Sequence, residues 1–291
     1  MSDPPPFPPN VALLISIVAV STASILIRMS ESAPLAIASY RLIFSTLILL
    51  PFFIGFGSFE KLRSISRRDL LNLVAVGIVL ALHFGSWITS LSFTSVSSSV
   101  IFVHVDPIFV AAVSHFLFGE RIDRQTLLGI VIAFVGATVI ALGDAGIGEM
   151  NLYGDFLALI GALMLGLYIL SGRRIRQSLD LVTYVTPVYA TSAVVLTLGG
   201  FATGTRMASL PFSEYLLFFV IALVPMIFGH TVYNWALKYV EAPIVSISLL
   251  GEPVGATILA YLFLGEAPSA LSLVGGAITL SGIYLSIRSR Q

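Results

Sequence analysis

The chain carries one segment twice, as HVDPIFVAAVSHFLFGERID at residues 104–123 and as LLGEPVGATILAYLFLGEAPS at residues 249–269. Asp106-Pro107 in the first copy matches Glu252-Pro253 in the second, at an offset of 146 residues (252 − 106). The same offset superimposes three further pairs without a gap: Gly119-Glu120 on Gly265-Glu266, Gly129 on Gly275, and Gly136 on Gly282. So many matches in one register indicate an internal repeat.

The composition places this repeat in a membrane. Of the 291 residues, 57% are hydrophobic and only 10% are charged, whereas a soluble domain carries roughly 25% charged residues. The formal net charge is +0, which leaves no basic surface for nucleic acid. The sequence has 0 cysteines, which excludes disulfides, thiolate catalysis and cysteine-based metal sites. We expect an integral membrane protein whose partners are the lipid bilayer and a small molecule, with no metal or cofactor.

A spanning helix needs about 20 predominantly apolar residues. The hydropathy pattern predicts ten such helices, at residues 11–29, 34–56, 70–92, 96–118, 125–143, 152–172, 180–203, 213–238, 242–264 and 269–287. Residues 1–10 are rich in proline and predict a disordered tail. The first apolar run lacks preceding basic residues, so we expect a retained helix and not a cleaved signal.

The basic residues set the expected orientation. With the amino terminus in the cytoplasm, 12 of the 15 Lys and Arg residues fall on the cytoplasmic side: Lys61, Arg63, Arg67, Arg68, Arg121, Arg124, Arg173, Arg174, Arg176, Lys238, Arg288 and Arg290. Only Arg28 and Arg206 lie outside, and Arg41 lies within a span. The positive-inside rule therefore predicts a multi-pass membrane protein with both termini in the cytoplasm.

Residues 11–143 and residues 152–287 would each contribute five helices to one transport domain. Because five is odd, the second half must enter the membrane from the opposite side. The predicted fold is thus an all-α integral membrane protein, with ten transmembrane helices as two inverted five-helix repeats around a central cavity. Many secondary transporters have this plan and work by alternating access. A duplication kept only for folding, as in a receptor or scaffold, is the alternative.

Ionisable groups at mid-membrane depth are expensive and usually face a cavity or a partner. Counted from the connecting turns, His83 and Asp106 lie near the midplane, and His230 and Glu252 lie at similar depths in the second half. We therefore expect one His–carboxylate pair in each half. Such pairs could couple transport to protons, although uniport is equally compatible with the sequence.

Each acid also precedes a proline, Pro107 or Pro253, which cannot donate to the carbonyl four residues earlier. Each helix should kink or restart there. The acids then have two open interpretations: caps of a restarting helix, or gating and coupling groups. Glu120 and Glu266 are expected to be turn or cap residues.

A second set of residues predicts the substrate site. His83 and Trp87 share one face of the third predicted helix, and His230, Tyr233 and Asn234 lie on the eighth. Arg41, preceded by Tyr40, could hold a carboxylate with its guanidinium. Helix packing is the alternative for the aromatic lining residues, and Arg41 could instead pair with a backbone carbonyl or extend toward the membrane surface. His104 is two residues from Asp106, so we expect it to point elsewhere and to pack.

The two quoted segments, with their acid-proline pairs and Gly-Glu ends, resemble the signature of the EamA-type family in the drug/metabolite transporter superfamily, with Asp in the first copy where Glu is more usual. The resemblance covers essentially the whole chain. It implies export of amino acids and related metabolites across the bacterial inner membrane, with aromatic amino acids exported by one branch. It also implies a central cavity lined by His83, Trp87, Asp106, His230, Tyr233 and Glu252.

Two differences from other branches of the superfamily restrict the class of substrate that we expect. Cationic-drug exporters of the superfamily use a glutamate in the first helix, and none lies between Val11 and Met29. Sugar-phosphate carriers rely on basic pocket residues, for which Arg41 is the sole candidate. A zwitterion or another neutral metabolite fits better, and we expect the monomer to be functional. The competing class, an intramembrane enzyme acting on lipid or peptide, would need a nucleophile and base, yet no such motif is present. We therefore expect no catalytic residues and no enzyme activity.

Overall fold

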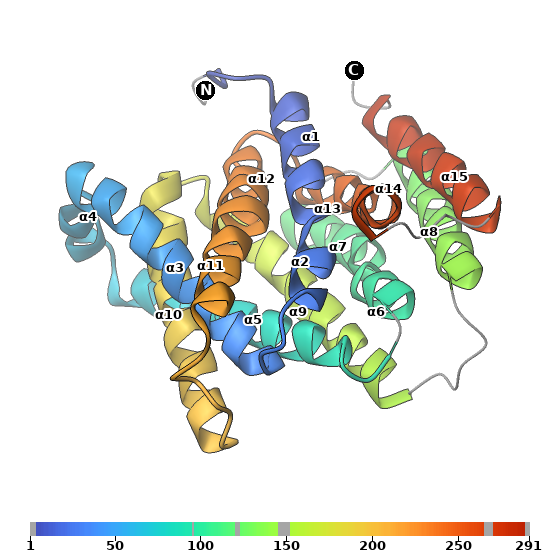
Figure 1. Ribbon diagram of the computed structural model, residues 1–291. Helices are drawn as coiled ribbons and strands as arrows, with labels where there is room; N and C mark the ends of the chain where they lie inside the picture. Colours follow the sequence, from blue (N-terminus) through green and yellow to red (C-terminus); the bar gives the residue numbers. More distant parts are fainter. Residues whose placement is uncertain (1–3, 95, 120–122, 145–151, 265–269, 289–291) are drawn as a thin grey trace.

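The computed structural model describes residues 4–94, 96–119, 123–144, 152–264 and 270–288. Within these ranges the chain is helical and contains no strand (Figure 1). Glu120 and Glu266 lie outside the described residues. The helices, including two π-helical segments η1 and η2, are α1 (Pro9–Val20), α2 (Ala23–Arg28), α3 (Pro34–Gly55), α4 (Ser58–Ser64), α5 (Arg67–Ser90), α6 (Val96–Val103), α7 (Asp106–Val113), η1 (Ser114–Phe118), α8 (Arg124–Asp144), α9 (Leu152–Ile175), α10 (Leu181–Ala202), α11 (Phe212–Ile221), η2 (Ala222–Thr231), α12 (Val232–Ala236), α13 (Ala242–Leu249), α14 (Gly251–Leu264) and α15 (Ala270–Arg288).

The described chain has 7 helical segments that are long and apolar enough to cross a membrane. Two shorter apolar stretches, Arg124–Gly136 and Leu273–Leu285, lie in α8 and α15. The predicted span at 96–118 consists of the short helices α6, α7 and η1. The all-helical membrane fold is therefore confirmed, whereas the number of ten spans stays a prediction.

The prolines break their helices where the sequence predicts. The prediction that each helix restarts at its acid-proline pair is confirmed, because α6 ends at Val103 and α7 begins at Asp106, while α13 ends at Leu249 and α14 begins at Gly251. Val103 and Leu249 lie four residues before the prolines, so their carbonyls have lost the intrahelical donor.

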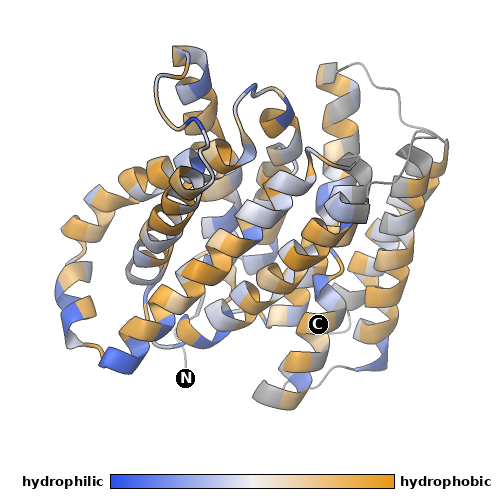
Figure 2. Ribbon diagram, turned by 90° about the horizontal axis from the view of Figure 1, so that it is seen from below, coloured by the Kyte–Doolittle hydropathy of each residue, from blue (hydrophilic) through white to orange (hydrophobic). Residues whose placement is uncertain are grey.

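The outward faces of the helices are apolar. Figure 2 shows hydrophobic residues along most of the ribbon, with hydrophilic residues gathered mainly near helix ends. Large side chains such as Ile54, Leu71 and Phe212 are 68%, 67% and 82% exposed. Apolar surface of this extent is stable against lipid but not against water.

Helices α8 and α15 pack along each other at one end of the molecule (Figure 1). A Cβ atom on Gly136 would collide with the backbone N of Thr279, and a Cβ on Gly282 with the backbone N of Ala133. The Thr279 hydroxyl donates to the Ala133 carbonyl at 3.4 Å. These contacts are reciprocal, because the repeat offset carries Ala133 to Thr279 and Gly136 to Gly282. The residue numbers rise along one helix as they fall along the other, so α8 and α15 run antiparallel.

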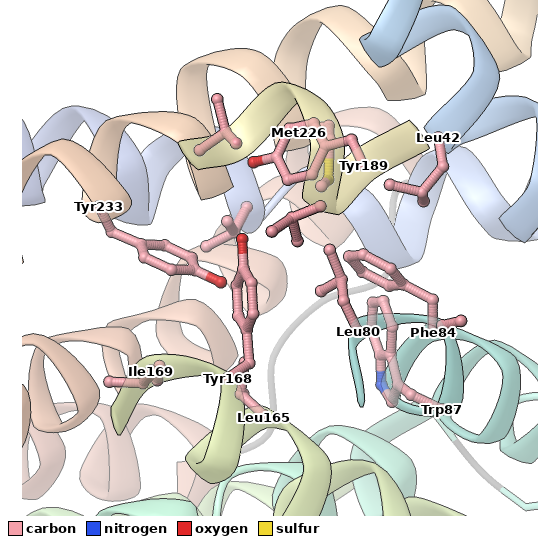
Figure 3. Packing of buried hydrophobic residues seen from close by; sticks show 14 of the residues in the cluster. Leu42, Leu80, Phe84, Trp87, Leu165, Tyr168, Ile169, Tyr189, Met226 and Tyr233 are labelled. Carbon is pink, nitrogen blue, oxygen red and sulfur yellow. The ribbon is translucent and has the colours of Figure 1, made fainter. Parts of the chain in front are cut away.

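The main hydrophobic core lies between α3, α5, α9, α10 and α12. Helices α7 and α14, which begin near the acid-proline pairs, separate this core from α8 and α15. Figure 3 shows part of it: Phe84 and Trp87 from α5 face a central region, and the rings of Tyr168 and Tyr233 meet beside that region. The centroids of the two tyrosine rings are 6.3 Å apart, in an edge-to-face arrangement. The buried aromatic residues thus surround the point where the broken helices meet.

Candidate functional site

A small cavity lies where three interrupted helices converge. The interruptions separate α1 from α2, α6 from α7, and α13 from α14. The cavity is lined by Val20, Ala23, Arg41, His83, Trp87, Val103, His104, Leu165, His230, Tyr233, Leu249 and Glu252. The cavity volume is about 20 Å³, which is enough for one or two water molecules. An amino acid therefore enters only if the surrounding helices move apart.

Arg41 is the most unusual residue in this cavity. Its side chain is fully buried, at 0% exposure, and all three guanidinium nitrogens lack a hydrogen-bond partner. Its guanidinium carbon lies 4.1 Å from the centroid of the Phe84 ring, a cation–π contact. An uncompensated buried charge costs several kcal/mol, about 3–5 when one partner of a buried pair is removed. The guanidinium is thus prepared for an anionic group.

Trp87 supplies a second unpaired donor. Its indole Nε1 is buried and has no hydrogen-bond partner. The ring lies nearly parallel to that of His83, with an angle of 6° and centroids 6.1 Å apart. His83 Nδ1 is 2.9 Å from the carbonyl oxygen of Gly161 on α9. Because a carbonyl only accepts, Nδ1 carries a proton, and in the neutral form of the ring Nε2 is an acceptor.

Glu252 forms an ion pair across the two halves of the chain. Its Oε2 atom is 3.4 Å from Nε2 of His104, while His104 Nδ1 is 2.8 Å from the Val100 carbonyl. The expectation that His104 points away and only packs is therefore wrong. His104 lies in the interruption between α6 and α7, so its direction does not follow from helical spacing relative to Asp106, and its side chain lines the cavity.

Asp106 also contacts the opposite half, outside the cavity. Its Oδ2 atom accepts a hydrogen bond from the Ser246 hydroxyl of α13, and its buried Oδ1 atom has no hydrogen-bond partner. Val105, the residue before α7, makes no side-chain cap, and Asp106 lies in the first turn of this helix, so the helix-cap interpretation of the two acids stays a prediction. The predicted pairing of His83 with Asp106 is wrong, because His83 is bonded to Gly161. The resemblance placed Asp106 in the cavity lining, and the structure does not.

The second half contributes a histidine–tyrosine pair. Tyr233 hydroxyl and His230 Nδ1 are 2.6 Å apart, so the predicted pairing of His230 with Glu252 is not formed. Asn234 lies behind them, where its Nδ2 donates to the Tyr168 hydroxyl at 2.9 Å and to the His230 carbonyl at 2.6 Å. Asn234 thus supports the lining residues and does not line the cavity itself.

Tyr40 faces a different neighbourhood. Its hydroxyl donates to the Met207 carbonyl at 2.6 Å, and its ring stacks on Phe218 of α11 at 5.2 Å between centroids. It does not line the cavity, and neither do Pro107 and Pro253. Of the residues that the sequence singled out, the structure gathers six around one space: Arg41, His83, Trp87, His230, Tyr233 and Glu252. That they bind substrate stays a prediction.

Sequence reasoning missed His104 as a polar lining residue and Phe84 as the surface beneath Arg41. Phe84 occupies the position equivalent to His230 under the repeat offset, a signal that could have revealed it. Among the residues that the structure describes, no group of His, Asp and Glu side chains is placed to hold a metal ion.

One charged contact near the helix ends stabilises the fold. Asp180 precedes α10 and accepts a hydrogen bond from the Thr183 backbone N–H at 3.0 Å, while Lys61 Nζ lies 2.9 Å from its Oδ2. Partial burial alone would raise the pKa of Asp180. The hydrogen bonds from Thr183 and Lys61 outweigh that effect and hold its pKa below the ordinary value.

Comparison with known proteins agrees with this architecture. The profile of the EamA-like transporter family matches residues 9–142 and 152–288. An uncharacterized transporter of Archaeoglobus fulgidus is 25% identical over 278 residues, which cover 95% of each chain. A probable terminal-alkyne amino-acid exporter of Streptantibioticus cattleyicolor is 26% identical over 191 residues, covering 64% of this chain and 62% of that protein. One crystal structure superposes with a TM-score of 0.81 at 15% identity, over 97% of this chain and 99% of that one.

Proposed function

Because the chain belongs to the EamA-like transporter family and is a multi-pass membrane transporter, we propose that it is a secondary transporter that exports amino acids, aromatic ones included, or related small metabolites. The observation that carries the proposal is Arg41, a buried guanidinium without a hydrogen-bond partner in a central cavity. A carboxylate matches its planar fork of donors. The name of the relative from Streptantibioticus cattleyicolor, a probable exporter of an amino acid, supports the same class.

The proposed mechanism is alternating access between two inverted five-helix repeats, residues 11–143 and residues 152–287. The antiparallel, reciprocal packing of α8 and α15 supports this arrangement, because equivalent helices of inverted repeats run in opposite directions. The family profile, which matches each half separately, supports it too.

Contacts between the halves at the helix breaks are candidates for the moving parts. The hydrogen bond from Ser246 to Asp106 and the pair of His104 with Glu252 each join one half to the other. A rocking motion of the halves would change both contacts. Asp106, Pro107, Glu252 and Pro253 are therefore proposed as gating or coupling residues, with proton coupling as one outcome to test.

The proposed setting is the inner membrane, with both termini in the cytoplasm and a functional monomer. Figure 1 shows the start of α1 and the end of α15 on the same side of the molecule, which agrees with this orientation.

The test is uptake of labelled phenylalanine, threonine and lysine into proteoliposomes containing the purified protein, with and without an imposed pH gradient. Saturable uptake that a gradient does not change would indicate uniport, and uptake driven by the gradient would indicate proton coupling. Absence of flux for a wide panel of amino acids, with protein shown to be folded and inserted, would contradict amino-acid export and favour another neutral metabolite.

A further inference from the structure

We infer that the cavity is a two-ended site for the backbone group of an α-amino acid, in which Arg41 and Trp87 hold the carboxylate and Glu252 takes the ammonium in place of His104. This inference rests on the proposed function and goes beyond it by assigning each end of the substrate to named atoms.

The end of the site that binds the carboxylate is formed by two side chains, Arg41 and Trp87, whose N–H donors have no hydrogen-bond acceptor. Arg41 and Trp87 line the same cavity, and neither the guanidinium nitrogens nor the indole Nε1 has a hydrogen-bond partner. Nearly all buried polar groups in folded proteins are paired, so unpaired donors around one space point to a missing acceptor. A carboxylate offers two acceptor oxygens and one negative charge, which satisfies both donors and neutralises Arg41.

The ammonium end is defined by acceptors. Glu252 lies in the same cavity and is 7% exposed. Its contact with His104 is a long one, 3.4 Å between nitrogen and oxygen. A substrate ammonium offers three N–H donors, whereas His104 Nε2 offers one at most, so the ammonium can make more and shorter hydrogen bonds to the carboxylate. His83 lines the same cavity, and Nε2 of its neutral form is a second acceptor there.

The two charged ends attract each other across the cavity but do not touch. Arg41 and Glu252 are both buried in one cavity, yet they form no ion pair with one another, since the Arg41 nitrogens have no partner. A zwitterion placed between them satisfies both charges and adds no net charge to the membrane interior. A simple anion would leave Glu252 facing a negative group, and a simple amine would leave Arg41 facing a positive one, each at a substantial electrostatic penalty.

The experiment compares three probes that share one side chain: L-phenylalanine, 3-phenylpropionate, which lacks the amino group, and 2-phenylethylamine, which lacks the carboxylate. Binding to the detergent-purified full chain is read from ligand-induced thermal stabilisation, and transport from competition with labelled phenylalanine in proteoliposomes. The wild-type protein should prefer phenylalanine to either analogue at least tenfold, because sites that pair a polar group reject analogues without it strongly.

The variants should lose these preferences separately. Glu252→Gln should abolish the preference over 3-phenylpropionate and keep the preference over 2-phenylethylamine, and Arg41→Gln should do the reverse. Glu60→Gln and Lys61→Gln remove the same charges at exposed sites far from the cavity and should leave both preferences unchanged. Arg41→Lys keeps the positive charge but lacks the planar set of guanidinium donors, so it should retain part of the preference over 2-phenylethylamine. It replaces Arg41→Gln in the comparison if the protein needs a cation at this position to fold.

Each outcome decides something different. Equal losses for all three probes in both variants would overturn the two-ended site and make Arg41 and Glu252 structural. Transport of phenylalanine by the wild type with no discrimination among the probes would also overturn it, while leaving the exporter function intact. Discrimination in binding without any transport would keep the two-ended site and contradict the exporter function. If neither the three probes nor the other amino acids tested for transport bind to the protein, the two-ended site is overturned.

Discussion

Replacing Gly282 by alanine should force α15 away from α8. The new Cβ would lie 2.8 Å from the Cα of Ala133 and 2.6 Å from the carbonyl oxygen of Gly129, whereas carbon atoms in good contact are about 3.5–4.0 Å apart. Both neighbours are backbone, so no side chain can rotate away and the helices must separate by roughly 0.7–1.2 Å. Such a gap forfeits about a quarter to a half of the attraction of each atom pair across it.

The expected destabilisation is about 1–3 kcal/mol, the usual range for overpacking a close contact. Gly276→Ala is the matched control on the same helix, since its Cβ would lie 3.7 Å from the nearest atom, Cγ1 of Val254. That variant should be neutral or gain up to about 1 kcal/mol from the helix propensity of alanine. Because the contact is reciprocal, Gly136→Ala should behave like Gly282→Ala.

The assay is the apparent unfolding midpoint of each purified variant in one detergent at one heating rate. A change of 1 kcal/mol corresponds to roughly 2–4 °C for a chain of this size class, so Gly282→Ala and Gly136→Ala should unfold several degrees below Gly276→Ala. Equal midpoints for all three variants would refute the close packing. A large effect of Gly282→Ala with none for Gly136→Ala would refute its reciprocity, and with it this support for inverted repeats.

Three further substitutions test individual contacts. Ser246→Ala should lower the unfolding midpoint by the equivalent of about 1–3 kcal/mol, because it leaves the buried Asp106 carboxylate without its hydrogen-bond donor; an unchanged midpoint would show that the contact is dispensable. Gly161→Ala places a Cβ 3.2 Å from that of Trp87, so it should reduce transport by shifting the cavity wall while the midpoint falls by less than that of Gly282→Ala. Asp180→Ala should cost about 1 kcal/mol at neutral pH through the lost helix cap. Since the folded pKa of Asp180 lies below the unfolded value of about 3.9, its stabilisation is present above that value and is lost as the pH falls through the folded pKa. Asp180→Asn keeps a good cap, and its stability relative to the wild type should therefore rise as the medium is acidified.

The sequence by itself determined the membrane-embedded helical class, the internal repeat and the helix breaks. These follow from local properties: apolar composition over about 20 residues, residue identities at one offset, and the missing N–H of Pro107 and Pro253. The mid-depth placement of Glu252 also indicated a cavity residue, because an ionisable group is expensive against lipid, whereas for Arg41 the sequence left the role open.

The tertiary structure alone decided which polar groups meet. His104 pairs with Glu252, and Ser246 with Asp106, across segments more than 100 residues apart in the chain, as the separation of 140 residues between Ser246 and Asp106 illustrates. Whether two such side chains touch depends on how each helix is rotated and where it is interrupted, and a one-residue change in either redirects a side chain by about 100°. For the same reason Tyr40 faces α11 although it adjoins Arg41 in the sequence. The absence of a partner for the Arg41 guanidinium is a property of the packed protein, since it depends on what every neighbouring helix fails to supply.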